Sequence, residues 1–218
     1  MKIVRIVLLV LLIAVGGVLA MAATKPTHYH IERSATISAA PAAVFAHVND
    51  FHAWEAWSPW EKIDPAMKRT FEGPPSGKDA TYAWVGNDKV GEGKMTIIES
   101  QPDARVGIRL EFIKPFAATN TTEFTFKPEG DNTLVTWTME GKNNFMSKAF
   151  CLFMNMDKMI GGQFQEGLAK MNSVVAGGAK ESDEAAKPAP EEKEPSTAGE
   201  NPAPEAEKPA DESEKPAE

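Results

Sequence analysis

Hydrophobic and polar positions alternate along much of the middle of the chain. Residues 28–37, HYHIERSATI, alternate with period two, and strand-like segments follow residue 67. Period two is typical of a strand with one buried face, and short glycine-bearing connections favour antiparallel pairing. We therefore expect one early strand and then five or six more in an antiparallel sheet. The clearest later segments are KDATYAWVGN, GEGKMTIIES, ARVGIRLEFIK, TTEFTFKPEG and DNTLVTWTMEG.

Two short helices are expected between the first strand and the others. In SAAPAAVFAHVNDF the spacing becomes helical, because Val44, Phe45 and Val48 form an apolar face. Pro41 suits the first position of this helix. The next segment, FHAWEAWSPW, holds three of the five tryptophans of the chain. Pro59 is expected to interrupt a second short helix there.

A long helix is expected to close this region. Ser147 suits an N-cap, and apolar residues then recur at helical spacing for about seven turns. Gly161 and Gly162 lie in the middle of this pattern. They allow either a close approach of the helix to the sheet or room for a ligand, and the sequence leaves both open. The apolar stripe is Phe150, Phe153, Met154, Ile160, Phe164, Leu168, Met171 and Val175.

Residues 1–23 form an apolar segment that is expected to enter or cross a membrane. Lys2 and Arg5 precede an uncharged run from residue 6 to residue 23. One interpretation is an uncleaved anchor, since a spanning helix needs roughly 20 apolar residues. The other is a secretory signal cleaved near Ala22, which leaves a periplasmic or secreted protein. Both place the basic start in the cytoplasm and the rest of the chain on the extracytoplasmic side.

Residues 177–218 are expected to be a disordered acidic tail. They contain 13 acidic and 5 basic residues, seven prolines, and no Val, Ile, Leu, Met or aromatic residue. Such a segment cannot bury enough apolar surface to offset the entropy lost on folding. A protein partner of the tail is not identifiable. The folded domain is therefore expected over residues 24–176.

The composition argues against several classes of function. Residues 1–176 carry 18 basic and 18 acidic residues, so the domain lacks the basic field that nucleic-acid binding requires. Cys151 is the single cysteine, which rules out an intrachain disulfide. No nucleotide-binding or nucleophile motif is present, and no cofactor is expected. His28 and His30 share a strand face that is expected to meet solvent, so no metal site is predicted.

The order of these elements resembles a known superfamily. The resembling residues are PAAVFAHVNDFHAWEAWSPWEKIDPAMKRTFEG, GKDATYAWVGNDKVGEGKMTIIESQP, LEFIKPF and LFMNMDKMIGGQFQEGLAKM. They are similar to the SRPBCC (START-like, Bet v 1-like) superfamily, in particular its polyketide cyclase/dehydrase-like branch. The resemblance implies an α+β helix-grip fold, in which a curved antiparallel sheet wraps around a long C-terminal helix. It also implies a cavity between the sheet and that helix.

The candidate ligand-binding residues follow from this resemblance and from the apolar pattern. Trp54, Trp57 and Trp60 would lie in a wedge at one end of the cavity, where they either seal the core or contact a ligand. Plain core packing is the alternative for the other aromatic residues also. The remaining candidates are Tyr82, Trp84, Phe112, Trp137, Met139, Phe153, Asp157, Ile160, Gly161 and Phe164.

Three functions remain open at this point. The first is binding of a hydrophobic small molecule or lipid in the cavity by an exported or membrane-anchored domain. The second is a cyclase or dehydratase-like enzyme, which needs an acid/base in the cavity; the sequence offers only Asp157 and His52 as weak candidates. The third is an envelope scaffold that interacts through its tail. Whether the protein is an enzyme is left open.

Overall fold

The computed structural model describes residues 2–143, 148 and 154–185. The chain divides into two units, residues 1–186 and residues 187–218, and the first unit contains every element described below. The predicted N-cap Ser147, together with Phe150, Cys151 and Phe153, lies outside the described residues.

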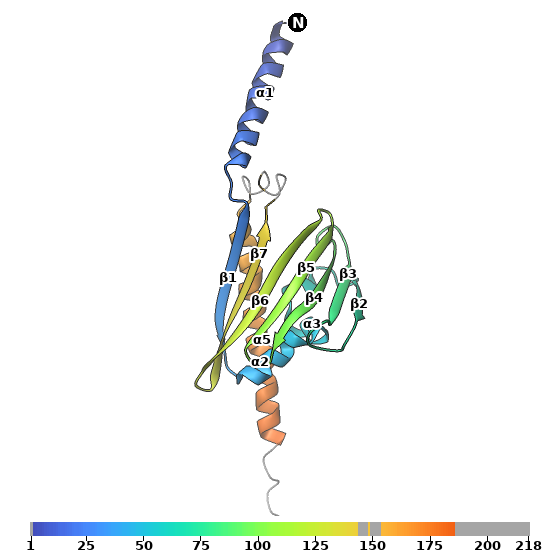
Figure 1. The fold of residues 1–218 in the computed structure, drawn as a ribbon, viewed down its shortest axis with the longest axis vertical. Coiled ribbons are helices and arrows are strands. Elements are labelled where there is room, and N and C mark those ends of the chain that lie inside the picture. Colours follow the sequence, from blue (N-terminus) through green and yellow to red (C-terminus); the bar gives the residue numbers. More distant parts are fainter. Residues whose placement is uncertain (1, 144–147, 149–153, 186–218) are drawn as a thin grey trace, which may run out of the picture. The chain divides into compact units, whose positions relative to one another are not determined.

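A seven-stranded antiparallel sheet forms the body of the domain (Figure 1). The spatial order of its strands is β1-β7-β6-β5-β4-β3-β2, and every neighbouring pair is antiparallel. One early strand followed by six others confirms the expectation from the alternating pattern. The strands are β1 (His28–Ile37), β2 (Lys68–Glu72), β3 (Thr81–Val85), β4 (Glu92–Gln101), β5 (Arg105–Lys114), β6 (Ala118–Glu129) and β7 (Asn132–Lys142).

Short helical segments follow β1, as the sequence predicts. Pro41 occupies the first turn of α2 (Pro41–Asn49), where its missing N–H is not needed. The tryptophan-rich segment forms η1 (Phe51–Ala53) and α3 (Trp54–Trp57). Ser58 then adopts an extended conformation and Pro59 begins η2 (Pro59–Lys62). The predicted interruption at Ser58-Pro59 is therefore confirmed.

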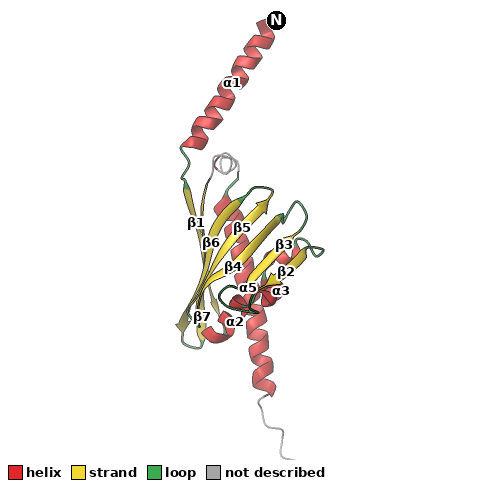
Figure 2. Ribbon diagram, turned by 45° about the vertical axis from the view of Figure 1, so that its right-hand side comes forward, coloured by secondary structure: helices red, strands yellow, loops and turns green. Residues whose placement is uncertain are grey.

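The long helix α5 (Met156–Ala185) crosses the inner face of the sheet (Figure 2). It begins at Met156, where Asn155 supplies the cap: Asn155 Oδ1 accepts a hydrogen bond of 2.9 Å from the Lys158 amide. The helix also continues to Ala185, past the expected boundary at residue 176. Sheet and helix together form the α+β helix-grip fold.

The N-terminal segment forms the helix α1 (Lys2–Ala23). Its 22 residues are long and apolar enough to cross a membrane, and a signal sequence would satisfy the same criterion. At 1.5 Å per residue, such a helix is about 33 Å long, which matches a hydrocarbon core of about 30 Å.

Candidate functional site: an aromatic cavity under the sheet

A cavity of about 160 Å³ lies between the sheet, α5 and the helical segment 54–62. Its walls are almost entirely apolar. The lining residues from the helical segment and α5 are Trp54, Ser58, Trp60, Glu61, Ile160 and Phe164. Those from the strands and their connections are Met67, Tyr82, Trp84, Val90, Met95, Leu110, Phe112, Thr122, Trp137 and Met139.

Four of the five tryptophans line this cavity, and the three clustered ones do not play the same part. Trp54 and Trp60 belong to the lining, whereas Trp57 does not. Trp57 is fully buried, and its ring packs edge-on against Phe124 at 6.0 Å. The indole N–H of Trp54 donates to the Val48 carbonyl, and that of Trp57 donates to the His47 carbonyl. Both bonds fix α3 against α2.

One side of the cavity is set by a stack between the sheet and α5. The rings of Trp137 and Phe164 are parallel, with centroids 4.0 Å apart. Trp137 Nε1 donates to Thr122 Oγ1 at 2.8 Å, and Thr122 Oγ1 donates in turn to the Thr138 carbonyl. The buried indole N–H is thereby satisfied, so this ring is held in one orientation.

Trp84 reaches the cavity because Gly93 has no side chain. A Cβ at Gly93 would lie 2.4 Å from the Trp84 ring and 2.6 Å from the Glu111 carbonyl. The pairing of β4 shifts register next to this glycine. Trp84 Nε1 donates to the Val90 carbonyl, which ties the β3–β4 connection to the cavity wall.

A buried carboxylate, Glu61, is the feature that sequence reasoning missed. Its side chain is only 6% exposed. Arg69 Nε donates to Glu61 Oε2 at 2.7 Å, and the Tyr82 hydroxyl donates to Glu61 Oε1 at 2.7 Å. Burial raises the pKa of Tyr82, and the hydrogen bond to Glu61 raises it further. Tyr82 therefore stays a neutral donor, and Arg69 balances the charge of Glu61.

Two further polar groups lie on the same segment as Glu61. Ser58 is buried and Trp60 is partly buried, and both line the cavity. Within the described part of the chain, neither the Ser58 hydroxyl nor the Trp60 indole N–H has a hydrogen-bond partner. The segment 58–61 therefore presents a hydroxyl, an N–H and a carboxylate at one side of an otherwise apolar cavity.

Asp157 lies outside the cavity, contrary to its assignment as a ligand-contacting or catalytic group. It forms a two-pronged ion pair with Arg33 of β1, with Nη1–Oδ1 and Nη2–Oδ2 distances of 3.0 and 2.9 Å. Its side chain is 61% exposed. The hydrogen bonds from Arg33 lower the pKa of Asp157.

Gly161 serves the same ion pair and does not line the cavity. A Cβ at this position would lie 2.1 Å from Arg33 Nη2. The missing side chain therefore leaves room for the guanidinium between β1 and α5, and of the two open interpretations the close approach applies. A Cβ added at Gly162, by contrast, would meet no atom within 4 Å.

The histidines also lie away from the cavity lining. His52 bonds to Asp50 at 2.8 Å and stacks on Phe71 at 4.1 Å, so it is a surface residue and not a cavity base. His30 lies between Glu140 and Glu32, and the hydrogen bond with Glu140 raises its pKa. Among the described residues, no group of three His, Cys, Asp or Glu side chains is arranged to hold a metal ion.

Nine of the thirteen expected residues line the cavity, and seven lining residues were not expected. Trp57, Asp157 and Gly161 lie elsewhere, and Phe153 is outside the described residues. Leu110 and Met95 share their strand faces with predicted neighbours, so period two could have found them. Glu61 could have been found only from its position directly after Trp60. The unexpected residues are Ser58, Glu61, Met67, Val90, Met95, Leu110 and Thr122.

Residues 28–176 match the family model described as polyketide cyclase / dehydrase and lipid transport. The chain belongs to this family. Membership places it in the SRPBCC superfamily and confirms the resemblance inferred from the sequence. The family is built on a ligand-binding fold, in keeping with the cavity. A comparison with curated proteins finds no match.

Solved structures share the fold at low sequence identity. A solution structure from Thermobifida fusca is 22% identical, with a TM-score of 0.52, and the match covers 67% of this chain and 92% of that one. A crystal structure from Chromobacterium violaceum is 14% identical, with a TM-score of 0.49 and coverages of 69% and 98%. The Aha1 dimer from Colwellia psychrerythraea is 12% identical, with a TM-score of 0.49 and coverages of 67% and 96%. The similarity to the Thermobifida fusca structure shows a shared fold and carries no statement about function.

Proposed function

We propose that this protein binds a small hydrophobic molecule in the cavity, as an exported or membrane-anchored domain. The observation that carries the proposal is a hollow of about 160 Å³ lined mainly by aromatic and aliphatic side chains. Comparable apolar cavities, of about 150 Å³, remain dry and take up benzene. Burying apolar ligand surface there contributes about 25 cal/mol per Å².

The volume sets the size of the ligand. Pockets for drug-sized ligands measure about 300–1,000 Å³, so this cavity suits one ring with a short substituent, or the end of one acyl chain. A two-chain lipid would need the walls to move apart. We therefore favour a small hydrophobic molecule over a whole lipid.

The polar groups on segment 58–61 define one end of the ligand. Ser58 and Trp60 offer a hydroxyl and an N–H that have no partner among the described residues, and Glu61 offers carboxylate lone pairs beyond those used by Arg69 and Tyr82. A ligand hydroxyl can donate to Glu61 and accept from Trp60 or Ser58. The proposed ligand is thus an apolar molecule with one hydroxyl or similar group.

Native mass spectrometry of protein purified from its own host tests this function. We expect a retained small molecule that is lost in Leu110→Trp, because the larger side chain fills the cavity. A wild-type protein that is repeatedly recovered empty, and that takes up no small apolar probe, would contradict the proposal.

A second candidate is an enzyme of the cyclase or dehydratase kind. It is favoured by one observation, the buried carboxylate of Glu61 on the cavity wall. Glu61 replaces Asp157 and His52 as the acid/base candidate, because general acid/base catalysis requires hydrogen-bond reach to the substrate. If the ligand recovered from the host is chemically altered by wild-type protein and not by Glu61→Gln, this candidate is supported over simple binding.

The scaffold function can be separated from both by truncation after Ala185, which leaves α5 complete. Ligand binding is expected to survive this truncation, because every described lining residue precedes residue 165. A loss of binding in the truncated protein would argue that residues 186–218 take part.

A further inference from the structure

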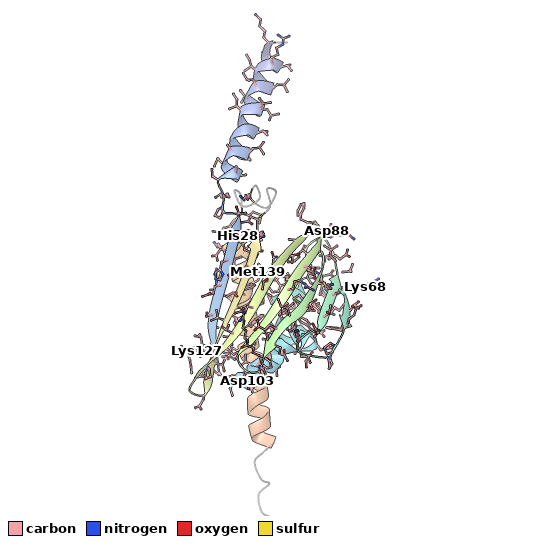
Figure 3. All side chains as sticks on the ribbon, viewed as in Figure 1. His28, Lys68, Asp88, Asp103, Lys127 and Met139 are labelled. Carbon is pink, nitrogen blue, oxygen red and sulfur yellow. The ribbon has the colours of Figure 1, made fainter. Side chains whose placement is uncertain are left out.

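At one end of the sheet lie the strand termini and connections that follow α1 most closely. Because the strands are antiparallel, β1 starts at this edge, as do β6 and β4, while β7, β5 and β3 end there. Figure 3 shows His28 and Asp88 at this end of the sheet, and Lys127 and Asp103 at the opposite end. We call the end of the sheet that contains His28 and Asp88 the α1-proximal edge; it consists of strand termini and connections, and not of an edge strand.

The connection between α1 and this edge is very short. The Pro26 carbonyl accepts a hydrogen bond from Asn143 Nδ2, and the Thr27 carbonyl accepts one from the Asn143 amide. Only Thr24 and Lys25 separate the end of α1 from these bonded residues. An extended chain spans at most about 3.3–3.6 Å per residue. If α1 spans a bilayer, the α1-proximal edge is therefore held within roughly 15 Å of its surface.

This edge exposes large apolar side chains at the end of β5 and on the β5–β6 connection. Phe116 is 66% exposed and Ile113 is 51% exposed. The connections at the opposite end of the sheet differ, since residues 73–80, 102–104 and 130–131 contain no exposed large apolar side chain. Exposed aromatic residues beside a membrane are typical of interfacial anchoring.

The charges at the α1-proximal edge suit an anionic bilayer surface. Among the described residues, exposed or partly exposed lysines lie there, including Lys25, Lys89, Lys114 and Lys142. Of the acidic side chains that face them, Glu92 pairs with Lys114 and Glu140 pairs with His30, which leaves Asp88.

Two partly buried residues of the cavity lining lie close to this edge. Val90 and Phe112 are lining residues that are only partly buried, and they lie on the β3–β4 connection and at the end of β5. An apolar ligand dissolved in a bilayer at this edge would have a short route to the cavity.

We propose that the α1-proximal edge lies against the bilayer that holds α1, with Phe116 and Ile113 inserted among the lipid headgroups, so that the cavity takes its ligand from the membrane. This proposal rests on α1 being retained as an anchor, and it adds a source of ligand to the proposed function.

Quenching by brominated lipids tests the proposed orientation in the full-length protein. Phe116→Trp and Lys127→Trp place one added tryptophan at opposite ends of the sheet, both on exposed positions that do not have a positive φ. Each variant is reconstituted in vesicles of phosphatidylcholine and phosphatidylglycerol with bromine near the headgroup. The wild-type signal, from the five native tryptophans, is subtracted.

We expect the added tryptophan at position 116 to be quenched several-fold more strongly than the one at position 127. Equal quenching at the two positions, or none at either, would overturn the proposal. So would recovery of the mature protein from its host without residues 1–22. These outcomes leave ligand binding untouched, because that is measured on the isolated protein by retention of the ligand.

Discussion

The two halves of the domain interior are built from the same strands and the same helix, yet one is filled and the other is hollow. In the filled half, α2, η1 and α3 insert Val48, Phe51 and Trp57 against the sheet. In the hollow half, side chains such as Trp60 pack against the sheet and α5 without filling the space between them, and a cavity remains among the described residues.

Single strands contribute to both halves. On β5, Val106 and Ile108 are fully buried in the filled half, whereas Leu110 and Phe112 line the cavity. On α5, Leu168 and Met171 are packed while Phe164 lines the cavity. The residue types are the same on both sides. The difference shows that a hollow in this fold depends on the side chains that face β5 and α5 from the opposite side. It does not depend on the residue types of β5 and α5 themselves.

The largest expected contrast is in stability. Trp57→Ala removes a fully buried ring from the filled half and should lower the free energy of unfolding by about 3–5 kcal/mol. Trp60→Ala removes a partly exposed ring from an existing hollow, so it should lower the free energy of unfolding clearly less than Trp57→Ala does. Chemical denaturation of the two variants measures both values. Equal losses would mean that the two halves are packed alike.

A matched pair on β5 tests the hollow by filling it. Leu110→Trp extends into the cavity and should abolish probe binding while changing the free energy of unfolding little. Ile108→Trp, two residues away on the same strand face, overpacks a filled site and should cost about 1–3 kcal/mol or more. Calorimetric titration and denaturation are run on both variants. Strong destabilisation by Leu110→Trp would show that position 110 has no free space beside it.

The polar end of the hollow half should determine selectivity. Glu61→Gln keeps the size of the side chain but removes the charge that accepts from Arg69 and Tyr82. We expect the preference for 4-propylphenol over propylbenzene to fall by about tenfold, in line with about 1.4 kcal/mol for a hydrogen bond to a charged group. Competition titrations with the two probes measure this ratio. An unchanged ratio would remove Glu61 from ligand recognition.

The smallest effect is expected from Asp157, because its ion pair with Arg33 is exposed and outside the cavity. Asp157→Asn should leave probe binding unchanged within about twofold. Since Arg33 lowers the folded-state pKa of Asp157, the pair stabilises the fold above the ordinary carboxyl pKa. That contribution is lost as the pH falls through the lowered pKa. Melting curves of wild type and Asp157→Asn should therefore differ near neutral pH and converge in acid; a loss of binding would return Asp157 to the site.

Much of the fold could be predicted from the sequence, because it depends on local signals. Period two identified the strands, Pro41 marked the start of α2, and Pro59 marked the interruption after α3. The expected N-cap at Ser147 lies outside the described residues, and α5 as described begins at Met156, where Asn155 caps it.

The candidate site was predictable only where a residue faces the interior from a regular element. Trp84, Phe112, Trp137 and Phe164 were found in this way. Glu61 was missed because its partners, Arg69 and Tyr82, come from two later strands. Asp157 was misplaced for the converse reason, since Arg33 on β1 draws it to the surface. Long-range pairs of this kind leave no local pattern in the sequence.

The account rests on a hollow that accepts an apolar ligand, and one titration tests this most directly. Four of the five tryptophans line the cavity, so 4-propylphenol added to the wild-type protein should change their fluorescence. We predict a saturable change with one ligand bound per chain. No saturable change up to the solubility limit of the probe would contradict the account.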